Sequence, residues 1–436
     1  MTIWEPVIIT MQHPQTTDYS VQVIGQPVTS GFSPSQADVI FTYGDLINRA
    51  IQAKKANPKL NVTIDFAIYR MARRVYIGFD SSDPETFRTV TGYDHGKGKT
   101  EKLLYSLLKA ARAEVRVRLL VQKDGRGGAD SDDISDLTDY LNDPDNWGGE
   151  YGDKSMHLAF RHVTWGVGSS QQMHNKFMLL SYVEDREGTV HHSCTYTTTA
   201  NIDPWLGPVP KKNLMQTGIV VLDHAPLHQH YRRYFNLLWK HCGDYGAFKK
   251  AVLDAHRADE TLNYSNPGDP CIKAYFYPVK DAWDPSFNPV AEMLQLLPQM
   301  RHEERFIKMN MAFLRKDFWE EFCTRVPSGQ GQSRLNVAIK THDDGSQTGV
   351  FGIQPGVNYP AWVNSHENRR KTHAKNIQFM VYGEDEKKRH VSITGSVNAK
   401  GNGYLCKANN ALMLTDPPGE GSKAMYSAFR AMFNEA

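Results

Sequence analysis

The stretch MHNKFMLL, residues 173–180, carries the strongest fold signal in the chain. His174 and Lys176 stand two positions apart, and in a strand this spacing places both side chains on the same face. The four apolar residues that follow, 177–180, are typical of a buried strand. We therefore expect a buried apolar strand whose first residues carry two cationic side chains.

A second stretch, THAKNIQF at residues 372–379, repeats this pattern with His373 and Lys375. In both copies a charged turn and a second apolar strand follow, and a run of small residues then ends in Asn. These asparagines are Asn201 and Asn398, so the spacing is nearly equal in the two copies. We infer an internal duplication.

Helical and strand patterns alternate in both copies, which predicts an α/β fold. Strands are expected at 61–71, 115–123, 304–313 and 335–342, and helices at 43–56, 100–114 and 316–325. The chain divides into an extended N-terminal segment over 1–35, a first half over 36–255, a linker over 256–270 and a second half over 271–436. The linker is assigned because that segment is polar and contains Asn, Gly and Pro.

The charge balance and the cysteines exclude some classes of protein. The chain has 50 Lys and Arg against 48 Asp and Glu, so it lacks the charge excess of a dedicated nucleic-acid binder. The five cysteines are scattered without a CxxC pair, which argues against a zinc site or a disulfide framework and predicts buried free thiols. No signal-peptide pattern and no run of about 18 apolar residues is present. We expect a cytoplasmic protein, or one exported without a recognisable signal.

Each half offers one His, one Lys and one Asn, and the two sets meet at one site if the halves pack about a pseudo-twofold axis. This combination fits a phosphodiester. The lysines would neutralise the non-bridging oxygens, and the asparagines would donate hydrogen bonds to them. One neutral histidine would attack phosphorus, and the other would protonate the leaving oxygen. Because the lysines supply the positive charge, we expect neither a metal nor a cofactor.

These motifs resemble those of the phospholipase D superfamily, whose mark is a duplicated H-x-K motif followed by G-S-x-N. The second copy matches both pieces, with HAK at 373–375 and GSVN at 395–398. The first copy has HNK at 174–176 and TTAN at 198–201, with threonines in place of Gly and Ser. The resemblance implies two α/β/α sandwich halves related by a pseudo-twofold axis, with one active site at their interface.

The same resemblance implies a reaction through a covalent phosphohistidine, with His174 as the nucleophile and His373 as the general acid. Thr199 and Ser396 are expected to support the site. The implied enzyme hydrolyses a phospholipid, or transfers its phosphatidyl group, and contacts a membrane surface transiently. Because both half-sites lie in one chain, we expect a monomer.

Two departures from the family pattern bear on the chemistry. Ser181 and Met380 stand where the family has Asp, five residues after each Lys. Gln216 and Asn410 align with the carboxylates that usually hold the catalytic imidazoles. An amide oxygen accepts an imidazole N–H and fixes its tautomer, but it stabilises imidazolium less than a carboxylate does. We therefore expect activity to fade at mildly alkaline pH.

The missing Asp residues are similar to the pattern of tyrosyl-DNA phosphodiesterases in the same superfamily, which leaves a nucleic-acid phosphodiester as an alternative substrate. The basic stretches 70–74 and 96–102 favour it, whereas the near-neutral charge and the acidic segment 124–153 favour the lipid. A third alternative is a non-catalytic phosphate-binding descendant of the fold. The missing carboxylates favour this alternative, and the two intact His–Lys–Asn sets oppose it.

Other side chains are weaker candidates. Trp205, Tyr359 and Trp362 are candidates for a substrate pocket, although ordinary packing of loops is the simpler explanation. His191 and His192 lie in an expected strand and are interpreted as structural.

Overall fold

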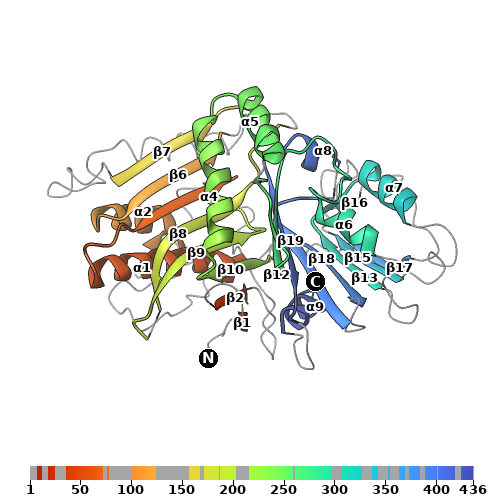
Figure 1. The fold of residues 1–436 in the computed structure, drawn as a ribbon, viewed down its shortest axis with the longest axis horizontal. Helices are drawn as coiled ribbons and strands as arrows, with labels where there is room; N and C mark the ends of the chain where they lie inside the picture. The colour runs from red at the N-terminus through yellow and green to blue at the C-terminus, as the bar shows by residue number, and fades with distance from the viewer. Residues whose placement is uncertain are drawn as a thin grey trace.

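The structure, a computed structural model, describes most of both expected halves, which stand side by side in Figure 1. The described residues are 7–11, 18–24, 36–71, 76–77, 101–123, 157–166, 171–185, 187–202, 216–258, 261–296, 306–326, 336–341, 352–353, 363–368, 373–382, 388–399, 401–417 and 424–435.

The first half is built on an eight-stranded mixed sheet with the strand order β1-β2-β10-β9-β8-β3-β6-β7. Its strands are β1 Val7–Met11, β2 Tyr19–Ile24, β3 Thr63–Ile68, β6 Arg116–Gln122, β7 Leu158–Val163, β8 Lys176–Glu184, β9 Val190–Thr198 and β10 Gly218–Leu222. Strands β3, β6 and β7 are parallel, and the other neighbours are antiparallel. Helices α1 Gln36–Ala56 and α2 Leu103–Arg112 cover one face, and α4 Ala225–Lys240 and α5 Tyr245–Arg257 cover the other.

The second half has an equivalent sheet with the order β11-β12-β20-β19-β18-β13-β15-β17. Its strands are β11 Tyr264–Asn266, β12 Asp269–Phe276, β13 Phe306–Met311, β15 Asn336–Thr341, β17 Val363–Asn368, β18 Lys375–Tyr382, β19 Lys388–Gly395 and β20 Asn410–Thr415. Helices α6 Pro289–Leu296 and α7 Lys316–Arg325 pack on one face, α9 Ala424–Glu435 packs on the other, and the short α8 Gly401–Leu405 connects β19 to β20. Two small sheets pair β4 Tyr76–Ile77 with β5 Glu101–Lys102, and β14 Phe313–Leu314 with β16 Gly352–Ile353.

The two large sheets agree strand by strand, in order and in pairing direction. Strand β8 occupies the place of β18, β3 that of β13, and β10 that of β20. An internal duplication requires this agreement. The predicted fold class, two α/β halves with helices on both faces of each sheet, is therefore confirmed.

The apolar run after Lys176 follows from the helices on both faces of the first sheet. Phe177 and Leu179 belong to the core that α4 covers, whereas Met178 and Leu180 belong to the core under α1. A strand that is covered on both faces is apolar throughout. The strand is thereby anchored on two sides, which positions the cationic residues at its beginning.

A shared core joins the two halves. Tyr231 and Tyr234 of α4 pack against Phe177 of β8 and Phe276 of β12, with ring centroids between 4.8 and 6.3 Å apart. The same cluster continues into β20 and α9. Burial of a large apolar side chain contributes about 1.5–3 kcal/mol, so the halves are held together by a substantial interface.

Two segments outside the expected halves are more ordered than the sequence suggested. The N-terminal segment contributes β1 and β2 to the first sheet, because Tyr19, Val21 and Val23 alternate with polar residues and bury one face. The expected linker 256–270 contains the end of α5, strand β11 and the beginning of β12. It is fixed by the buried Asp269, to which Tyr19 and the N-cap residue of α4, His224, both hydrogen-bond.

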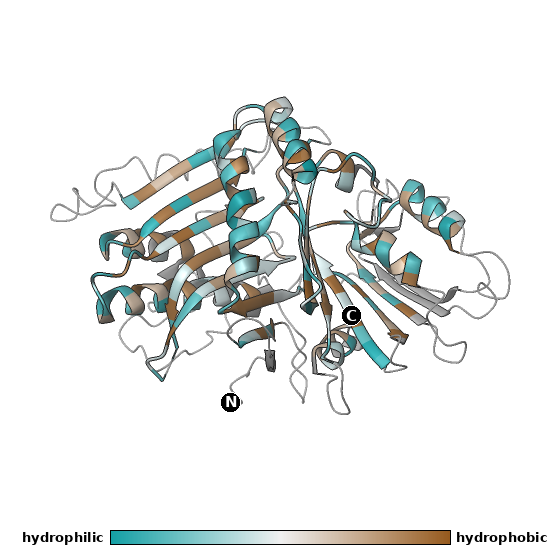
Figure 2. Cartoon of the chain, viewed as in Figure 1, coloured by the Kyte–Doolittle hydropathy of each residue, from teal (hydrophilic) through white to brown (hydrophobic). Residues whose placement is uncertain are grey.

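The cysteines form no disulfides, and helices α4 and α5 are amphipathic (Figure 2). All five cysteines are free thiols, but only Cys194 is fully buried and the other four are half-buried. Figure 2 shows hydrophilic and hydrophobic residues alternating along α4 and α5, as expected of helices with one face in the core. Within the described residues no helix combines the length and the apolar character that crossing a bilayer requires.

Candidate active site

The two H-x-K motifs lie where strands β8 and β18 begin. Lys176 is the first residue of β8 and pairs with Ile68 at the end of β3. Lys375 is the first residue of β18 and pairs with Met311 at the end of β13. Each histidine therefore precedes its strand by two residues, in the same place in both halves.

A short backbone pairing joins the halves at this point. The backbone N of His174 donates to Ala408 O over 2.7 Å, and Ala408 N donates to Gln172 O over 2.9 Å. Asn409, the residue after Ala408, therefore lies beside the first histidine although 235 positions separate the two in sequence.

The first histidine is held by the second half. His174 Nδ1 lies 2.9 Å from Ser396 O and 3.1 Å from Asn409 Oδ1. The amide of Asn409 is oriented by its Nδ2, which donates to Gly403 O over 2.8 Å. Because a carbonyl oxygen only accepts, Nδ1 carries the hydrogen and Nε2 carries the lone pair of the neutral ring.

The second histidine is held by the first half. Thr217 N donates to Thr199 Oγ1 over 2.9 Å, and Thr199 Oγ1 donates to Gln216 Oε1 over 2.7 Å. The same oxygen lies 3.1 Å from His373 Nδ1. The tautomer of His373 is therefore the same as that of His174, with the lone pair on Nε2 when the ring is neutral.

The expected partner of the first histidine, Asn410, is replaced by its neighbour Asn409. The backbone bonds from Ser396 N to Asn410 O and from Thr199 N to Thr217 O are equivalent, so Asn409 matches Gln216. The side chain of Asn410 instead donates to Thr197 Oγ1 over 2.8 Å and to the hydroxyl of Tyr231 over 3.0 Å. A shift of one residue reverses the side-chain direction in a strand, which explains the error.

Both lysines are buried beside their histidines. Lys176 is 0% and Lys375 is 2% exposed, and each Nζ donates to the backbone oxygen of the histidine two residues earlier over 2.9 Å. Burial lowers the pKa of Lys375 to about 7. Burial also lowers the pKa of Lys176 well below its usual value, and the charges of Lys375, Lys407 and Arg70 lower it further. An anion bound at the site would offset these costs.

The two asparagines follow the residues that orient the histidines. Asn398 comes two residues after Ser396, Asn201 comes two residues after Thr199, and both asparagines are buried. The residue after each asparagine forms a β-bridge with a residue just beyond a central strand. Ile202 pairs with Met71 after β3, and Ala399 pairs with Leu314 after β13. The structure thus places both expected His–Lys–Asn sets at one junction.

Three residues near the histidines were not expected from the sequence: Tyr69, Lys407 and Asn409. A fourth, Arg70, was expected only as part of the basic stretch 70–74. The Tyr69 ring lies 4.8 Å from the His174 ring, and Lys176 Nζ lies 5.3 Å from the centre of the Tyr69 ring. Tyr69 and Arg70 follow directly after β3, and a search for polar residues at the ends of the central strands would have found them.

The positions of the missing Asp residues lie within the strands. Ser181 Oγ accepts a hydrogen bond from Thr63 N over 2.9 Å and donates one to Asn61 O over 3.2 Å, which ties β8 to the beginning of β3. Met380 is buried in β18. These two residues therefore serve the sheets rather than the histidines.

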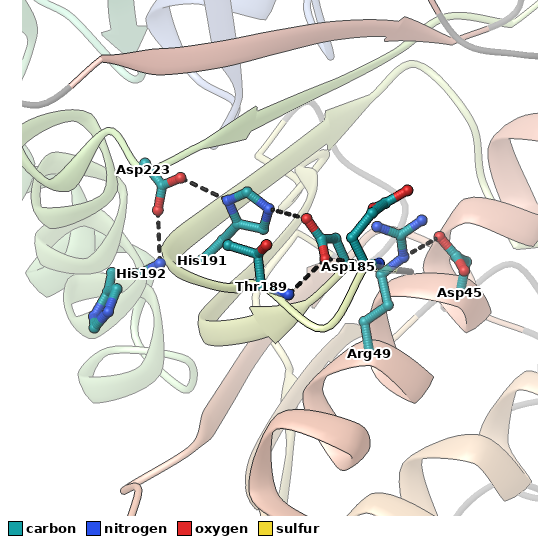
Figure 3. Close-up of polar contacts among 8 residues, drawn as sticks. Asp45, Arg49, Asp185, Thr189, His191, His192 and Asp223 are labelled. Carbon is teal, nitrogen blue, oxygen red and sulfur yellow. Dashed lines mark hydrogen bonds and ion pairs between the residues drawn. The ribbon is translucent and has the colours of Figure 1, made fainter. Parts of the chain in front are cut away.

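His191 and His192 are the second and third residues of β9, and Thr198 is its last residue. His191 is placed between Asp223, 2.6 Å from Nδ1, and Asp185, 3.2 Å from Nε2, as Figure 3 shows. The backbone N of His192 donates to Asp223 Oδ1 over 2.7 Å. Both histidines are remote from the H-x-K motifs, as their interpretation as structural residues requires.

Trp205, Tyr359 and Trp362 lie outside the described residues, so the expected pocket stays a prediction. Within the described ranges no group of three or more His, Cys, Asp or Glu side chains is arranged to hold a metal ion.

Comparisons with known proteins agree with this architecture. No protein-family model and no curated protein sequence matches the chain. Among solved structures, phosphatidylserine synthase from Haemophilus influenzae matches with a TM-score of 0.56 and 12% identity, over 99% of this chain and 87% of that one. This chain shares the fold of that synthase, with the α/β architecture in two halves that the duplicated motif predicts.

Two further solved structures are similar over smaller shares of this chain. Polyphosphate kinase from Porphyromonas gingivalis matches with a TM-score of 0.49 and 10% identity, over 90% of this chain and 48% of that one, so this chain spans about half of the kinase. Nuc from Salmonella typhimurium, described as a phospholipase D family member, matches with a TM-score of 0.28 and 13% identity, over 51% of this chain and 95% of that one.

Proposed function

We propose that the protein is a phosphodiesterase of the phospholipase D type, which cleaves a phosphodiester through a covalent phosphohistidine. The observation that carries this proposal is the crossed support of the two histidines. His174 Nδ1 is bound by acceptors of the second half, and His373 Nδ1 by an acceptor of the first half. Both rings therefore have the same defined tautomer, with Nε2 available for chemistry at phosphorus.

In the first step, the Nε2 lone pair of His174 forms a bond to phosphorus. The bond from phosphorus to the leaving oxygen breaks, and this oxygen takes a proton from His373 Nε2. The ring of His174 becomes positively charged while Nδ1–H remains bonded to Ser396 O and Asn409 Oδ1. These two oxygens stabilise the charged ring, which is the reason to assign the nucleophile to His174.

In the second step, His373 is neutral and acts as the base. Water gives a proton to His373 Nε2, its oxygen bonds to phosphorus, and the bond between phosphorus and His174 breaks. An alcohol in place of water gives transfer instead of hydrolysis. Lys176, Lys375, Asn201 and Asn398 stabilise the phosphoryl oxygens in both steps.

A phospholipid is the proposed substrate, and a nucleic-acid phosphodiester is the second candidate. The near-neutral charge of the whole chain favours the lipid. The extra cations Arg70 and Lys407 near the first histidine favour a more highly charged substrate such as a nucleic acid.

The substrate is tested by parallel incubation, in EDTA, with phosphatidylcholine vesicles, labelled single-stranded DNA and bis(4-nitrophenyl) phosphate. We expect phosphatidate from the vesicles, and a phosphatidyl ester of ethanol when ethanol is added. The double variant His174→Ala/His373→Ala is the negative control. Product from DNA alone would replace the lipid by the second candidate. No product from any of the three would support a non-catalytic descendant of the fold.

The roles of the histidines are tested by trapping the covalent intermediate. A 4-nitrophenyl phosphodiester labelled at the scissile phosphate, whose leaving group needs no proton from His373, is mixed with enzyme. The mixture is quenched in alkaline detergent, because a phosphorus–nitrogen bond is cleaved in acid. We expect the label on His373→Ala, whose intermediate has lost its base, and none on His174→Ala. The variant His191→Ala, which changes a histidine remote from the site, is the matched control and should behave as wild type. Label on His174→Ala and none on His373→Ala would reverse the assignment.

A further inference from the structure

Thr217, which directly precedes β10, is bonded across the interface between the two halves. Asn376 of β18 donates through its Nδ2 to Thr217 Oγ1 over 2.7 Å. The Thr217 hydroxyl directs its own hydrogen to Met432 Sδ of α9, 3.6 Å away, so its oxygen is available to accept. Thr217 belongs to the first half and both partners belong to the second. This side chain therefore anchors the beginning of β10 in the opposite half.

The amide of Asn376 is held in turn by the neighbouring strand β19. Ile377 pairs with Ile393, so Asn376 faces Thr394, and Thr394 Oγ1 donates to Asn376 Oδ1 over 2.8 Å. The side chains of Thr217, Asn376 and Thr394 are all at most 3% exposed. The orientation of the amide is fixed because its oxygen accepts from one strand and its nitrogen donates to the other half.

The backbone of Thr217 fixes the amide that orients His373. Thr217 N donates to Thr199 Oγ1, and Thr199 N donates to Thr217 O, both over 2.9 Å. Thr199 Oγ1 donates to Gln216 Oε1 over 2.7 Å, and this oxygen lies 3.1 Å from His373 Nδ1. A displacement of Thr217 would move both the hydroxyl and the amide. Asn376 therefore acts on His373 through this series.

A buried amide at position 376 is explained by this bond rather than by packing. Matching the two H-x-K motifs places Asn376 at the position of Phe177 in the first half, where the ring packs in the shared core. The fold thus accepts an apolar side chain at this place in a sheet. An amide is costly to bury unless its hydrogen bonds are made, and here they are made to Thr217 and Thr394.

The other histidine has an equivalent anchor built from different residues. Asn410 directly follows Asn409, the amide beside His174, and both belong to the second half. The Nδ2 of Asn410 donates across the interface to Thr197 Oγ1 over 2.8 Å and to the hydroxyl of Tyr231 over 3.0 Å. Because side chains alternate in direction along a strand, one residue contacts the histidine and the next reaches into the other half.

Resting on the proposed function, we propose that Asn376 and Asn410 are positioning residues of the reaction, each holding in place the amide that orients one histidine. Asn376 acts on His373, the general acid, and Asn410 acts on His174, the nucleophile. Both act through the amides rather than on the reacting atoms. A hydrogen bond to Nδ1 sets the direction of Nε2, and a displacement of about 1 Å at a reacting group costs up to about 10²-fold in rate.

The test compares leaving groups, because only the general acid depends on them. First-turnover rates are measured with bis(4-nitrophenyl) phosphate, whose leaving group needs no proton, and with phosphatidylcholine vesicles, whose leaving alcohol does. Single-stranded DNA replaces the vesicles if wild type cleaves only DNA. Asn376→Leu should lower the rate on the alkyl ester about tenfold or more, and nitrophenol release by less than about threefold. Asn410→Leu should lower both rates to a similar extent, by about tenfold or more.

A second variant removes the same bond from its other side. Thr217→Val keeps the shape of the side chain and should reproduce the selective loss of Asn376→Leu. The double variant should lose no more than the larger single loss, because both changes remove one contact. Thr217→Ser keeps the hydroxyl and should behave as wild type. The matched control is Thr195→Val, which removes another buried hydroxyl, 3.4 Å from His228 Nδ1, and should leave the ratio of the two rates unchanged.

All rates are measured below the midpoint of thermal unfolding of each variant, and Thr217→Val decides if Asn376→Leu does not fold. Equal losses on both esters in Thr217→Val, or rates equal to those of wild type, would overturn the inference. The same holds for a Thr217→Ser variant as impaired as Thr217→Val, and for a loss in Asn410→Leu that is confined to the alkyl ester. A wild type that cleaves no phosphodiester would instead contradict the proposed function.

Discussion

The two halves share a fold and differ in what surrounds their histidines. Both sheets have the same strand order, and in both a hydroxyl donates to an amide oxygen that contacts an imidazole. In the first half this series is Thr199 and Gln216, which hold His373; in the second it is Ser396 and Asn409, which hold His174. Each half therefore orients the histidine of the other, so the two half-sites depend on each other.

The difference concerns charge and backbone. His174 has Tyr69, Arg70 and Lys407 nearby, whereas Ala312 and Phe313, which match Tyr69 and Arg70 in the described part of the second half, are apolar. A duplicated site with identical halves would serve both histidines equally. Among the described residues this difference is in line with the two different roles proposed for the histidines, a nucleophile at His174 and an acid at His373.

The largest expected effect separates the two histidines by leaving group. His174→Ala should lose more than about 10³-fold in rate on every substrate, because no bond to phosphorus forms without the nucleophile. His373→Ala should lose as much on an alkyl ester but release 4-nitrophenol in a first turnover at a rate within about tenfold of wild type, because nitrophenolate leaves without a proton. Stopped-flow measurement of nitrophenol release checks this. Equal losses for both variants on both substrates would indicate equivalent histidines.

The next effect concerns Lys375, whose pKa is lowered to about 7 by burial. The ammonium form dominates below this pH and is lost above it, so kcat/KM for a nitrophenyl ester should fall as the pH rises above about 7. Lys375→Met should lose about 10²-fold at pH 6, as expected for one lost oxyanion donor. Lys375→Arg keeps its charge at all these pH values, so its kcat/KM should stay level to a higher pH. If kcat/KM of Lys375→Arg fell at the same pH as that of wild type, the fall would be caused by the titration of a group other than Lys375.

A third effect concerns stability and the small residues before each asparagine. Gly395 has φ of +149°, and a Cβ built there would lie 2.3 Å from Asn410 O, whereas the matched Thr198 has a negative φ. Gly395→Thr should therefore destabilise the protein by about 1–3 kcal/mol or more. The reverse change, Thr198→Gly, should cost about 1 kcal/mol through chain entropy and about 1 kcal/mol more because Thr198 Oγ1 accepts a hydrogen bond from Ala200 N. Thermal unfolding of both variants measures this. A midpoint of Gly395→Thr equal to that of wild type would show that the backbone at this position accepts a side chain.

The duplicated motif predicted the fold class and the six His, Lys and Asn side chains because these signals are local. Side chains two positions apart lie on the same face of a strand, and a run of four apolar residues predicts a strand that is covered on both faces. The repetition of the pattern then predicts two equivalent sheets. None of these inferences requires knowledge of long-range contacts.

The partners of the histidines were harder to predict because they depend on register between distant strands. The choice between Asn409 and Asn410 depends on where β20 begins, which the sequence does not define to within one residue. Lys407 reaches the site only because Ala408 pairs with the backbone of Gln172 and His174 in the other half. The pairing of β2 with β10 in the first sheet likewise joins segments that are distant in the sequence.

The smallest effect tests the two amides directly. Gln216→Glu places a carboxylate against Nδ1 of His373, which stabilises its imidazolium and should raise its pKa by about one unit. The direction of the change follows from the role of His373 as the acid. If His373 keeps its proton to higher pH, kcat/KM for an alkyl ester should begin to fall at a higher pH. The fall for a nitrophenyl ester, which needs no acid, should move less.

Asn409→Asp makes the same change beside His174, where a raised pKa protonates the nucleophile and should move the acidic limb to higher pH instead. The two variants therefore act on opposite limbs if the histidines differ in role, and pH–rate profiles with both esters measure this. An unmoved alkaline limb in Gln216→Glu would show that the amides do not adjust the site, and movement of the same limb in both variants would contradict the division of roles.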